Sequence, residues 1–399
     1  MNAGVVVAGV GVISGIGNNA PECLEALFNG KTGIGEIRRL QTAHSGHLPA
    51  AEVKLNNAEL AVITGFPPSE NRTAMLSLIA AREALNDSGI TTIAGLRIGF
   101  VSATTNGGMD KSEEFTAAFL SDKNKGRLRD ILHHDCGSIT AIVAEKLGIR
   151  HHISTISTAC SSSANAIMYA ARLIKHNLMD AVIAGGGDSL TRFTLNGFNT
   201  LMILDEHFCR PFDETRQGLN LGEGAGYVTL VSEQVAGQLN KQSYCRLTGY
   251  YNANDAYHQT ATSPEGDGPL WAMSGALSMA GLLPADIGYI NLHGTGTQNN
   301  DSSEAEAIKR LFHPAYPQMS STKSFTGHTL GASAGIEAVF SALAARDGLV
   351  FPNLRLDKPM ADLPFATDAI GSENPEIRHV LSNSFGFGGN CSSLVFSKL

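Results

Sequence analysis

The residue with the clearest chemical potential is Cys160, within the stretch Ser157-Thr-Ala-Cys160-Ser-Ser-Ser-Ala-Asn165. A strand-like run, Ile153 to Ala159, precedes it, and from Ser161 onward apolar residues recur at helical spacing. Cys160 is therefore predicted at a strand-to-helix turn, where the unpaired amides and the positive end of the helix dipole favour thiolate over thiol. We expect a nucleophile there. The alternative is a small buried cysteine of the core.

Two histidines in the second half of the chain lie in similar surroundings. His293 stands in Asn291-Leu-His-Gly-Thr-Gly-Thr297, and His328 ends Ser321-Thr-Lys-Ser-Phe-Thr-Gly-His328. Residues 319–337 also resemble residues 155–167, because in each a predicted strand ends at a Ser/Thr cluster and a helix of small residues begins. A duplication would place the two helix starts side by side about a pseudo-twofold axis. Cys160 and His328 would then meet.

The elements that must position these residues alternate between strands and helices, which predicts βαβ units and mixed sheets with helices on their faces. A short polar helix, residues 233–241, marks the expected junction between residues 1–243 and 244–399. The expected strands are 5–10, 96–103, 153–159, 180–188, 227–231, 287–292, 379–384 and 392–397, with another from Tyr244 and a turn at Ser320. The expected helices are 71–87, 269–280, 302–312 and 331–346.

The composition limits the class of protein. The chain has 399 residues, 43% hydrophobic and 17% charged, which fits a packed interior. Its net charge of −8 argues against a sequence-independent nucleic-acid binder. Six cysteines without a Cys-x-x-Cys pair fit free thiols in a reducing cytoplasm. No apolar run is long enough for a membrane span, and the glycine-rich start reads as a strand and turn.

Three other motifs look like binding sites for a metal ion or a dinucleotide, but their spacing does not favour such sites. Neighbouring side chains diverge, so His133-His-Asp-Cys136 and His151-His152 are not expected to hold a metal ion. Gly185-Gly-Gly187 lacks the spacing of a dinucleotide-binding loop, and close backbone packing explains it better. No metal site is expected.

The Cys160 turn, the two histidine motifs, Arg210-Pro-Phe-Asp213, Gly222-Glu-Gly-Ala-Gly226 and Asn383-Ser-Phe-Gly-Phe-Gly-Gly389 together resemble the β-ketoacyl-acyl-carrier-protein synthases of the thiolase superfamily. The resemblance runs essentially end to end. It implies an α/β fold of the duplicated thiolase type, with five αβαβα layers and two mixed sheets. It also implies a dimer, homomeric or heteromeric, that acts on an acyl-carrier protein. No separate cofactor is implied, because 4′-phosphopantetheine arrives on the carrier.

The resemblance assigns roles to individual residues. Cys160 would take up the acyl group as a thioester, and the backbone N–H groups of Cys160 and Phe387 would form an oxyanion hole. Neutral His293 and His328 would stabilise the enolate left by decarboxylation of a malonyl group. Lys323 would be an electrostatic support, and Glu304 would be a buried acid that organises Lys323 and the loops. Thr295 and Thr297 would contact the pantetheine. Phe387 would be a gate, with Gly386 and Gly388 as its flanks.

The chain departs from the family pattern at several positions. Ser163 replaces a common glycine, and Asn390-Cys391 shifts the asparagine that usually anchors the gate loop by one position. Asn106 occupies the slot of the acyl-pocket floor, where long-chain enzymes tend to carry an apolar residue. A buried amide without a partner costs about 1–3 kcal/mol. We therefore expect an acyl chain other than a plain long saturated one, namely short, polyunsaturated or aryl-capped.

Three rival interpretations remain at this point. Cys391 could be the second catalytic cysteine of a thiolase that acts on coenzyme A. The chain could be a non-catalytic chain-length partner of an active synthase, although such partners usually lack the nucleophile that is present here. It could also be a scaffold that binds carrier protein, in which case Cys160→Ser would cause no loss of function.

Overall fold

The computed structural model describes residues 4–90, 95–360 and 371–399. Ten strands form its main sheet, in the order β10-β9-β13-β14-β8-β1-β7-β6-β4-β5. The five strands of the first half and the five of the second half remain separate blocks in this order. Among the described residues, the two blocks pair where β1 meets β8, through Val6 with Arg246 and Val7 with Cys245. The two predicted mixed sheets are thus present and are joined along this short contact.

The first half supplies one sheet and its helices. Their bounds are β1 (Val5–Ser14), α3 (Arg72–Asp87), β4 (Ile98–Ala103), α5 (Cys136–Leu147), β5 (His152–Ile156), α6 (Ser162–Lys175), β6 (Ala181–Asp188) and β7 (Gly224–Ser232). The second half repeats this succession. Its elements are β8 (Cys245–Asn254), α9 (Asp267–Ala280), β9 (Tyr289–Asn291), α10 (Gln298–Phe312), β10 (Gln318–Ser320), α12 (Ser333–Asp347), β13 (His379–Gly386) and β14 (Asn390–Ser397).

The pairing pattern also repeats. In the first half β4 runs parallel to β5 and β6, whereas β7 is antiparallel to β6 and β1. In the second half β9 runs parallel to β10 and β13, whereas β14 is antiparallel to β13 and β8. Each strand of one half therefore has a counterpart with the same position and direction in the other. This topology confirms the predicted duplication.

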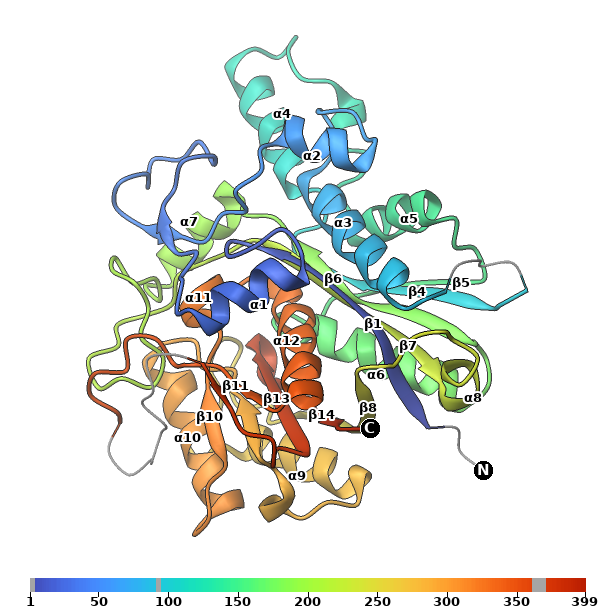
Figure 1. Ribbon diagram of the computed structural model, residues 1–399. Helices are drawn as coiled ribbons and strands as arrows, with labels where there is room; N and C mark the ends of the chain where they lie inside the picture. Colours follow the sequence, from blue (N-terminus) through green and yellow to red (C-terminus); the bar gives the residue numbers. More distant parts are fainter. Residues whose placement is uncertain (1–3, 91–94, 361–370) are drawn as a thin grey trace.

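Helices and sheets form five layers (Figure 1). The helices α3 and α5 cover the outer face of the first sheet, α9 and α10 cover the outer face of the second, and α6 and α12 lie between the sheets. The central helix α12 is buried along residues 333–345. A helix surrounded on all sides needs no polar face, which explains why its sequence consists of small and apolar residues without a clear stripe.

The glycines of β6 allow close packing, as predicted. A Cβ atom on Gly185 would lie 2.0 Å from the carbonyl oxygen of Gly226, and one on Gly187 would lie 2.2 Å from the Oγ of Ser77. No larger side chain fits at either position unless the neighbouring chain moves. The run thus serves the packing of the sheet.

Several boundaries differ from the expectations. The junction helix α8 spans only Glu233–Ala236, Ser320 ends strand β10 instead of forming a turn, and α10 begins four residues early. The polar region after residue 108 contains α4 (Met109–Ser121), which buries none of its residues and projects at the top of Figure 1. Asp135 caps α5, and His134 contacts Ser112, so residues 133–136 do not gather around one point.

The remaining short elements connect these layers. They are α1 (Ala20–Phe28), β2 (Gly35–Glu36), β3 (Pro49–Ala50), α2 (Asn57–Thr64), α7 (Arg192–Thr200), α11 (Lys323–Thr326), β11 (Leu349–Val350) and β12 (Ser372–Glu373). Among the described helices, none has the combination of length and apolar character that a bilayer crossing requires.

Candidate active site

Cys160 lies between the end of β5 and the start of α6, at the strand-to-helix turn that the sequence predicts. The residue before it, Ala159, has a φ of +52°, a left-handed conformation that is unfavourable for a residue with a Cβ atom. This sharp turn places Cys160 at the start of the helix, while its side chain remains buried, with 6% of the residue exposed.

Three side chains from distant parts of the chain converge at this turn. The Sγ atom of Cys160 and one ring nitrogen each of His293 and His328 all lie within 4.8 Å of one another. The two imidazole rings are nearly perpendicular, at 88°, with centroids 5.5 Å apart. The structure therefore brings together the three residues that the sequence analysis named as catalytic.

The hydrogen bonds of the two histidines fix their tautomers. The backbone N–H of Leu330 donates to Nδ1 of His328 at 3.0 Å, and Nζ of Lys323 lies 3.2 Å from Nδ1 of His293. Each Nδ1 is thus an acceptor, so in the neutral ring the proton is on Nε2. Both rings can then donate a hydrogen bond into the site. A protonated Nε2 is a poor metal ligand, so this donor set does not suit an ion.

Both histidines are held in the neutral form. Burial, aided by the positive charge of Lys323, lowers the pKa of His328 to about 3 and the pKa of His293 well below its usual value. Desolvation of the charged ring is the larger cause in each case, and the cation that the sequence analysis invoked comes second. At neutral pH the site therefore offers two uncharged donors.

The expectation of a thiolate at Cys160 is wrong for the free protein. Burial raises the pKa of the thiol to about 11, and this effect exceeds the opposing influence of Lys323 and of the backbone N–H groups of Phe387 and Cys160 that reach the sulfur. The stabilisation of a thiolate by a helix terminus is modest, and the free-energy cost of removing its charge from water is larger. Cys160 rests as a thiol and must lose its proton as it reacts.

The predicted link between Glu304 and Lys323 is also wrong. Lys323 forms an ion pair with Glu337, at 2.5 Å, and donates to the carbonyl oxygen of His293 at 2.7 Å. Glu304 instead accepts the backbone N–H groups of His293 and Gly294, both at 2.9 Å. Glu304 therefore organises the His293 loop, as expected, whereas the acid that holds Lys323 comes from α12.

Sequence reasoning missed Glu337, although a signal was present. It is the only charged residue between Gly331 and Ala345, a stretch otherwise composed of small and apolar residues. An acid in a helix that is buried on all sides needs a cationic partner, because an unpaired buried charge is strongly destabilising. Lys323, which is 1% exposed at its side chain, meets that need.

A cavity of about 260 Å³ opens onto the convergent side chains. Seven of the predicted site residues line it: Cys160, His293, Thr295, Thr297, His328, Gly386 and Phe387. The hydroxyl groups of Thr295 and Thr297 lie 2.9 Å apart on its wall. The cavity thus presents a thiol and two imidazoles at one place, with hydroxyl groups along the approach.

Four predicted residues lie outside the wall of this cavity. Lys323 and Glu304 lie behind His293, and the carbonyl oxygen of Gly388 accepts a hydrogen bond from Asn254 at 2.8 Å. Asn106 is buried at 5% exposure, and its Nδ2 donates to the carbonyl oxygen of Ser189 at 2.7 Å. Its amide is satisfied, so the desolvation cost invoked for an unpaired amide does not arise.

The two sequence departures are accommodated. The Oδ1 atom of Asn390 accepts hydrogen bonds from Ser161, Asn165 and Asn252, at 2.6, 3.1 and 2.8 Å. The shifted asparagine therefore anchors the loop after β13 to the start of α6. Ser163 is fully buried and donates to the carbonyl oxygen of Gly331, which ties α6 to the segment that follows His328.

Cys391 is not among the residues that converge with Cys160. It is fully buried in the apolar cluster between the second sheet and its outer helices, and burial raises its pKa far above the usual value. It does not line the cavity beside Cys160. The structure thus gives no support to a second catalytic cysteine at this position.

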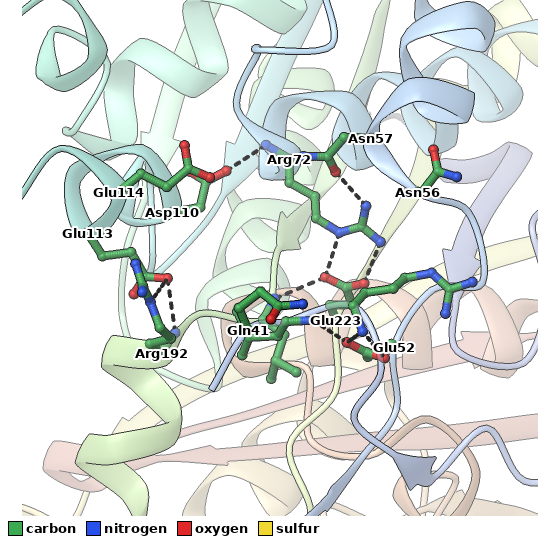
Figure 2. Close-up of a pocket in the computed structure, with 13 residues that line it drawn as sticks. Gln41, Glu52, Asn56, Asn57, Arg72, Asp110, Glu113, Glu114, Arg192 and Glu223 are labelled. Carbon is green, nitrogen blue, oxygen red and sulfur yellow. Dashed lines mark hydrogen bonds and ion pairs between the residues drawn. The ribbon is translucent and has the colours of Figure 1, made fainter. Parts of the chain in front are cut away.

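A larger cavity, of about 540 Å³, lies elsewhere in the first half and is shown in Figure 2. Four of its charged residues form ion pairs: Arg72 binds Glu223 through two nitrogens, at 2.6 and 2.9 Å, and Glu113 accepts from Arg192. These contacts join the segment of Glu223 to α3, and α4 to α7. The charges serve the structure, so size alone does not identify the reactive site.

Comparisons with known proteins agree with this geometry. Residues 2–236 match the N-terminal domain and residues 244–357 the C-terminal domain of beta-ketoacyl synthases. A 3-oxoacyl-[acyl-carrier-protein] synthase 2 of Staphylococcus aureus (strain COL) is 36% identical over 412 residues, which cover 100% of this chain and 99% of that protein.

Solved structures extend the likeness to three dimensions. The ishigamide ketosynthase/chain length factor has a TM-score of 0.93 at 28% identity and 100% coverage of both chains. A ketosynthase, ApeO, in complex with its chain length factor, ApeC, from Xenorhabdus doucetiae has a TM-score of 0.84 at 30% identity, with 99% and 98% coverage. The full-length match of sequence and fold shows that the chain belongs to the β-ketoacyl synthase family, and that it is an acyltransferase homologous to the 3-oxoacyl-[acyl-carrier-protein] synthases.

Proposed function

We propose that this protein is a β-ketoacyl-acyl-carrier-protein synthase that extends an acyl chain by two carbons through decarboxylative Claisen condensation. The observation that carries the proposal is the approach of one thiol and two neutral imidazoles, within 4.8 Å, at the wall of a cavity. The product would belong to fatty acid or specialised polyketide or polyene biosynthesis.

The first half-reaction loads the enzyme. The sulfur of Cys160 attacks the thioester carbonyl of an acyl-carrier protein, a new C–S bond forms, and the bond to the pantetheine sulfur breaks. The thiol proton of Cys160 leaves with the pantetheine thiolate, so the released carrier is a free thiol. The backbone N–H groups of Cys160 and Phe387, which reach the sulfur, would stabilise the negative charge on the carbonyl oxygen of the tetrahedral intermediate.

The second half-reaction forms the new carbon–carbon bond. A malonyl-carrier loses carbon dioxide, and the electron pair of the broken bond forms an enolate whose oxygen accepts hydrogen bonds from Nε2 of His293 and of His328. The enolate carbon then attacks the acyl thioester. The C–S bond to Cys160 breaks, and the sulfur takes up one proton from solvent. Neutral imidazole rings suit this role, because each ring donates its hydrogen bond to the enolate without a change in its own protonation state.

Cavity walls and partners complete the proposal. The hydroxyl groups of Thr295 and Thr297 would bind the pantetheine arm, and Phe387 with Gly386 and Gly388 would form the gate. The protein would work as a dimer, homomeric or paired with a chain-length factor; the similar ketosynthase ApeO is in complex with its chain length factor. Free cysteines fit a cytoplasmic setting. The preference for a chain other than a long saturated one stays a prediction, without the support of an unpaired amide at Asn106.

The positions of the cysteines and histidines favour this proposal over two of the rival interpretations. A thiolase needs a second cysteine at the reacting centre, whereas Cys391 is buried in an apolar cluster and does not line the cavity beside Cys160. A non-catalytic chain-length partner needs no nucleophile, whereas Cys160, His293 and His328 are all present and all converge.

Intact-mass measurement of acyl adducts on the protein, across a panel of acyl-carrier thioesters, tests the nucleophile and the selectivity together. We expect an adduct on the wild-type protein, none on Cys160→Ala, and an unchanged amount on the matched variant Cys391→Ala. The highest loading with saturated C12–C16 chains would refute the predicted acyl preference. An adduct that persists in Cys160→Ala would refute the assigned nucleophile.

A further inference from the structure

Two aromatic rings stack across the junction of the two halves. The ring centroids of Phe198, on α7, and Phe387, in the loop after β13, lie 5.8 Å apart, with an angle of 15° between the planes. Both side chains are half-buried, and both line the catalytic cavity. The roles proposed above for Phe387, as an oxyanion donor through its backbone N–H and as a gate, leave the contact of its ring with Phe198 without an assigned role.

The helix that carries Phe198 is firmly placed. Thr191 caps its first turn by accepting the N–H of Thr194 at 3.2 Å. Glu113 of α4 accepts the N–H groups of Arg192 and Phe193 at 3.2 and 3.0 Å, and Figure 2 shows this carboxylate against Arg192. Phe198 also packs against a buried apolar cluster, Ile37, Leu48, Ala50, Leu190, Leu195, Leu219, Leu221 and Leu330. The Phe198 ring is therefore held in place in the stacked pair.

The loop that carries Phe387 is less restricted by its own sequence. Gly388 and Gly389 have φ angles of +79° and +75°, in a region that glycine enters readily and leaves readily. The backbone of Gly388 makes two hydrogen bonds at the far side of the loop, to Gln259 and Asn254, both at 2.8 Å. A stacked aromatic pair is favourable beyond its buried area, and this contact biases such a loop toward one conformation.

We propose that Phe198 is a positioning residue, whose ring holds Phe387 so that the backbone N–H of Phe387 stays directed at the sulfur of Cys160. The inference rests on the proposed function, in which this N–H is one of two oxyanion donors. Acyl transfer to Cys160 requires both donors, whereas decarboxylation of the malonyl group requires His293 and His328. Removal of the Phe198 ring therefore affects the two half-reactions unequally.

The test separates the half-reactions in the full-length protein. For Phe198→Ala, we expect the rate of octanoyl loading from octanoyl-acyl-carrier protein, followed by intact mass, to fall about tenfold, since loss of a whole oxyanion donor costs about 100- to 1,000-fold. Release of carbon dioxide from malonyl-acyl-carrier protein should stay within about twofold of the wild-type rate. Phe193→Ala is the matched control, because this ring is on the same helix, is 61% exposed and does not line the cavity.

Phe198→Tyr keeps the stacked ring and should load at the wild-type rate, which preserves the test if the alanine variant folds poorly. Equal losses in both half-reactions, loading of Phe198→Ala at the wild-type rate, or the same loss in Phe193→Ala would each overturn the inference. A wild-type protein that neither loads octanoyl groups nor releases carbon dioxide would instead refute the proposed function itself.

Discussion

At the scale of single residues, burial decides the protonation states of the site. It raises the pKa of Cys160 and lowers the pKa values of His293 and His328, so all three groups are uncharged at neutral pH. The charge that remains nearby is the ion pair of Lys323 with Glu337, which lies behind His293. A site of neutral donors is suited to an enolate, whose negative charge develops only during the reaction.

This arrangement predicts how Cys160 reacts when no carrier is bound. Since only the thiolate is alkylated, the rate with iodoacetamide should rise about tenfold per pH unit from about pH 7 to 10 and should not level off before about pH 11. Peptide mass mapping over time would give the rate for Cys160, with the half-buried Cys136 as an internal reference. A plateau below about pH 8 would show that the helix terminus outweighs desolvation.

At the scale of elements, Glu304 connects α10 to the His293 loop. Its carboxylate also accepts from Nδ2 of Asn383 on β13, at 3.1 Å, so one side chain joins a helix, a loop and a strand. Burial raises its pKa to about 7. The folded protein therefore binds a proton on Glu304 at pH values where the unfolded chain does not.

The sign of the resulting pH dependence follows from this shift. The favourable contribution of protonated Glu304 is fully present below the unfolded pKa of about 4.5 and is lost as the pH rises toward about 7. The free energy of unfolding of the wild-type protein should fall with pH more steeply than that of Glu304→Gln, by up to about 1.4 kcal/mol per pH unit in this window. Urea unfolding of both proteins at several pH values measures this difference in slope.

Glu306→Gln provides the control, because Glu306 is on the same helix and is only half-buried. We expect this variant to keep the slope of the wild-type protein. Parallel curves for the wild type and Glu304→Gln would show that Glu304 does not take up a proton on folding.

At the scale of the whole molecule, the two halves depend on each other. We propose the division at residues 243 and 244, where β8 begins a second copy of the succession of strands and helices. The central layer belongs to both halves, since α6 and α12 pack on each other and α12 also packs on β6 and β7 of the first sheet. Removal of one half would expose an apolar face of the other.

Expression of residues 1–243 alone should therefore give a chain without a cooperative thermal unfolding transition, because β6 and β7 would lose the cover of α12. Circular dichroism during heating would measure this, with the full chain as reference. Coexpression with residues 244–399 should restore the transition. A cooperative transition of the isolated first half would show that each half is an independent domain.

Local sequence was sufficient to predict helices α3, α6, α9, α10 and α12, the turn that carries Cys160 and the repeat of the two halves, because spacing, capping residues and glycines act over a few neighbours. The convergence of Cys160 and His328 was also predictable, since a duplication relates the two helix starts. Helices α1, α2, α4, α5 and α7 were not predicted, and α4 is helical without burying any residue.

Residue types and their spacing are enough to identify which side chains could react and on which local elements they stand. Only the tertiary structure decided their charge states and partners. The pKa of Cys160 depends on how far water is excluded from it, and the partner of Lys323 depends on which of two acids, Glu304 or Glu337, the packing of α10 and α12 brings close. Desolvation and ion pairing are set by atoms far apart along the chain, and no local pattern encodes their distances.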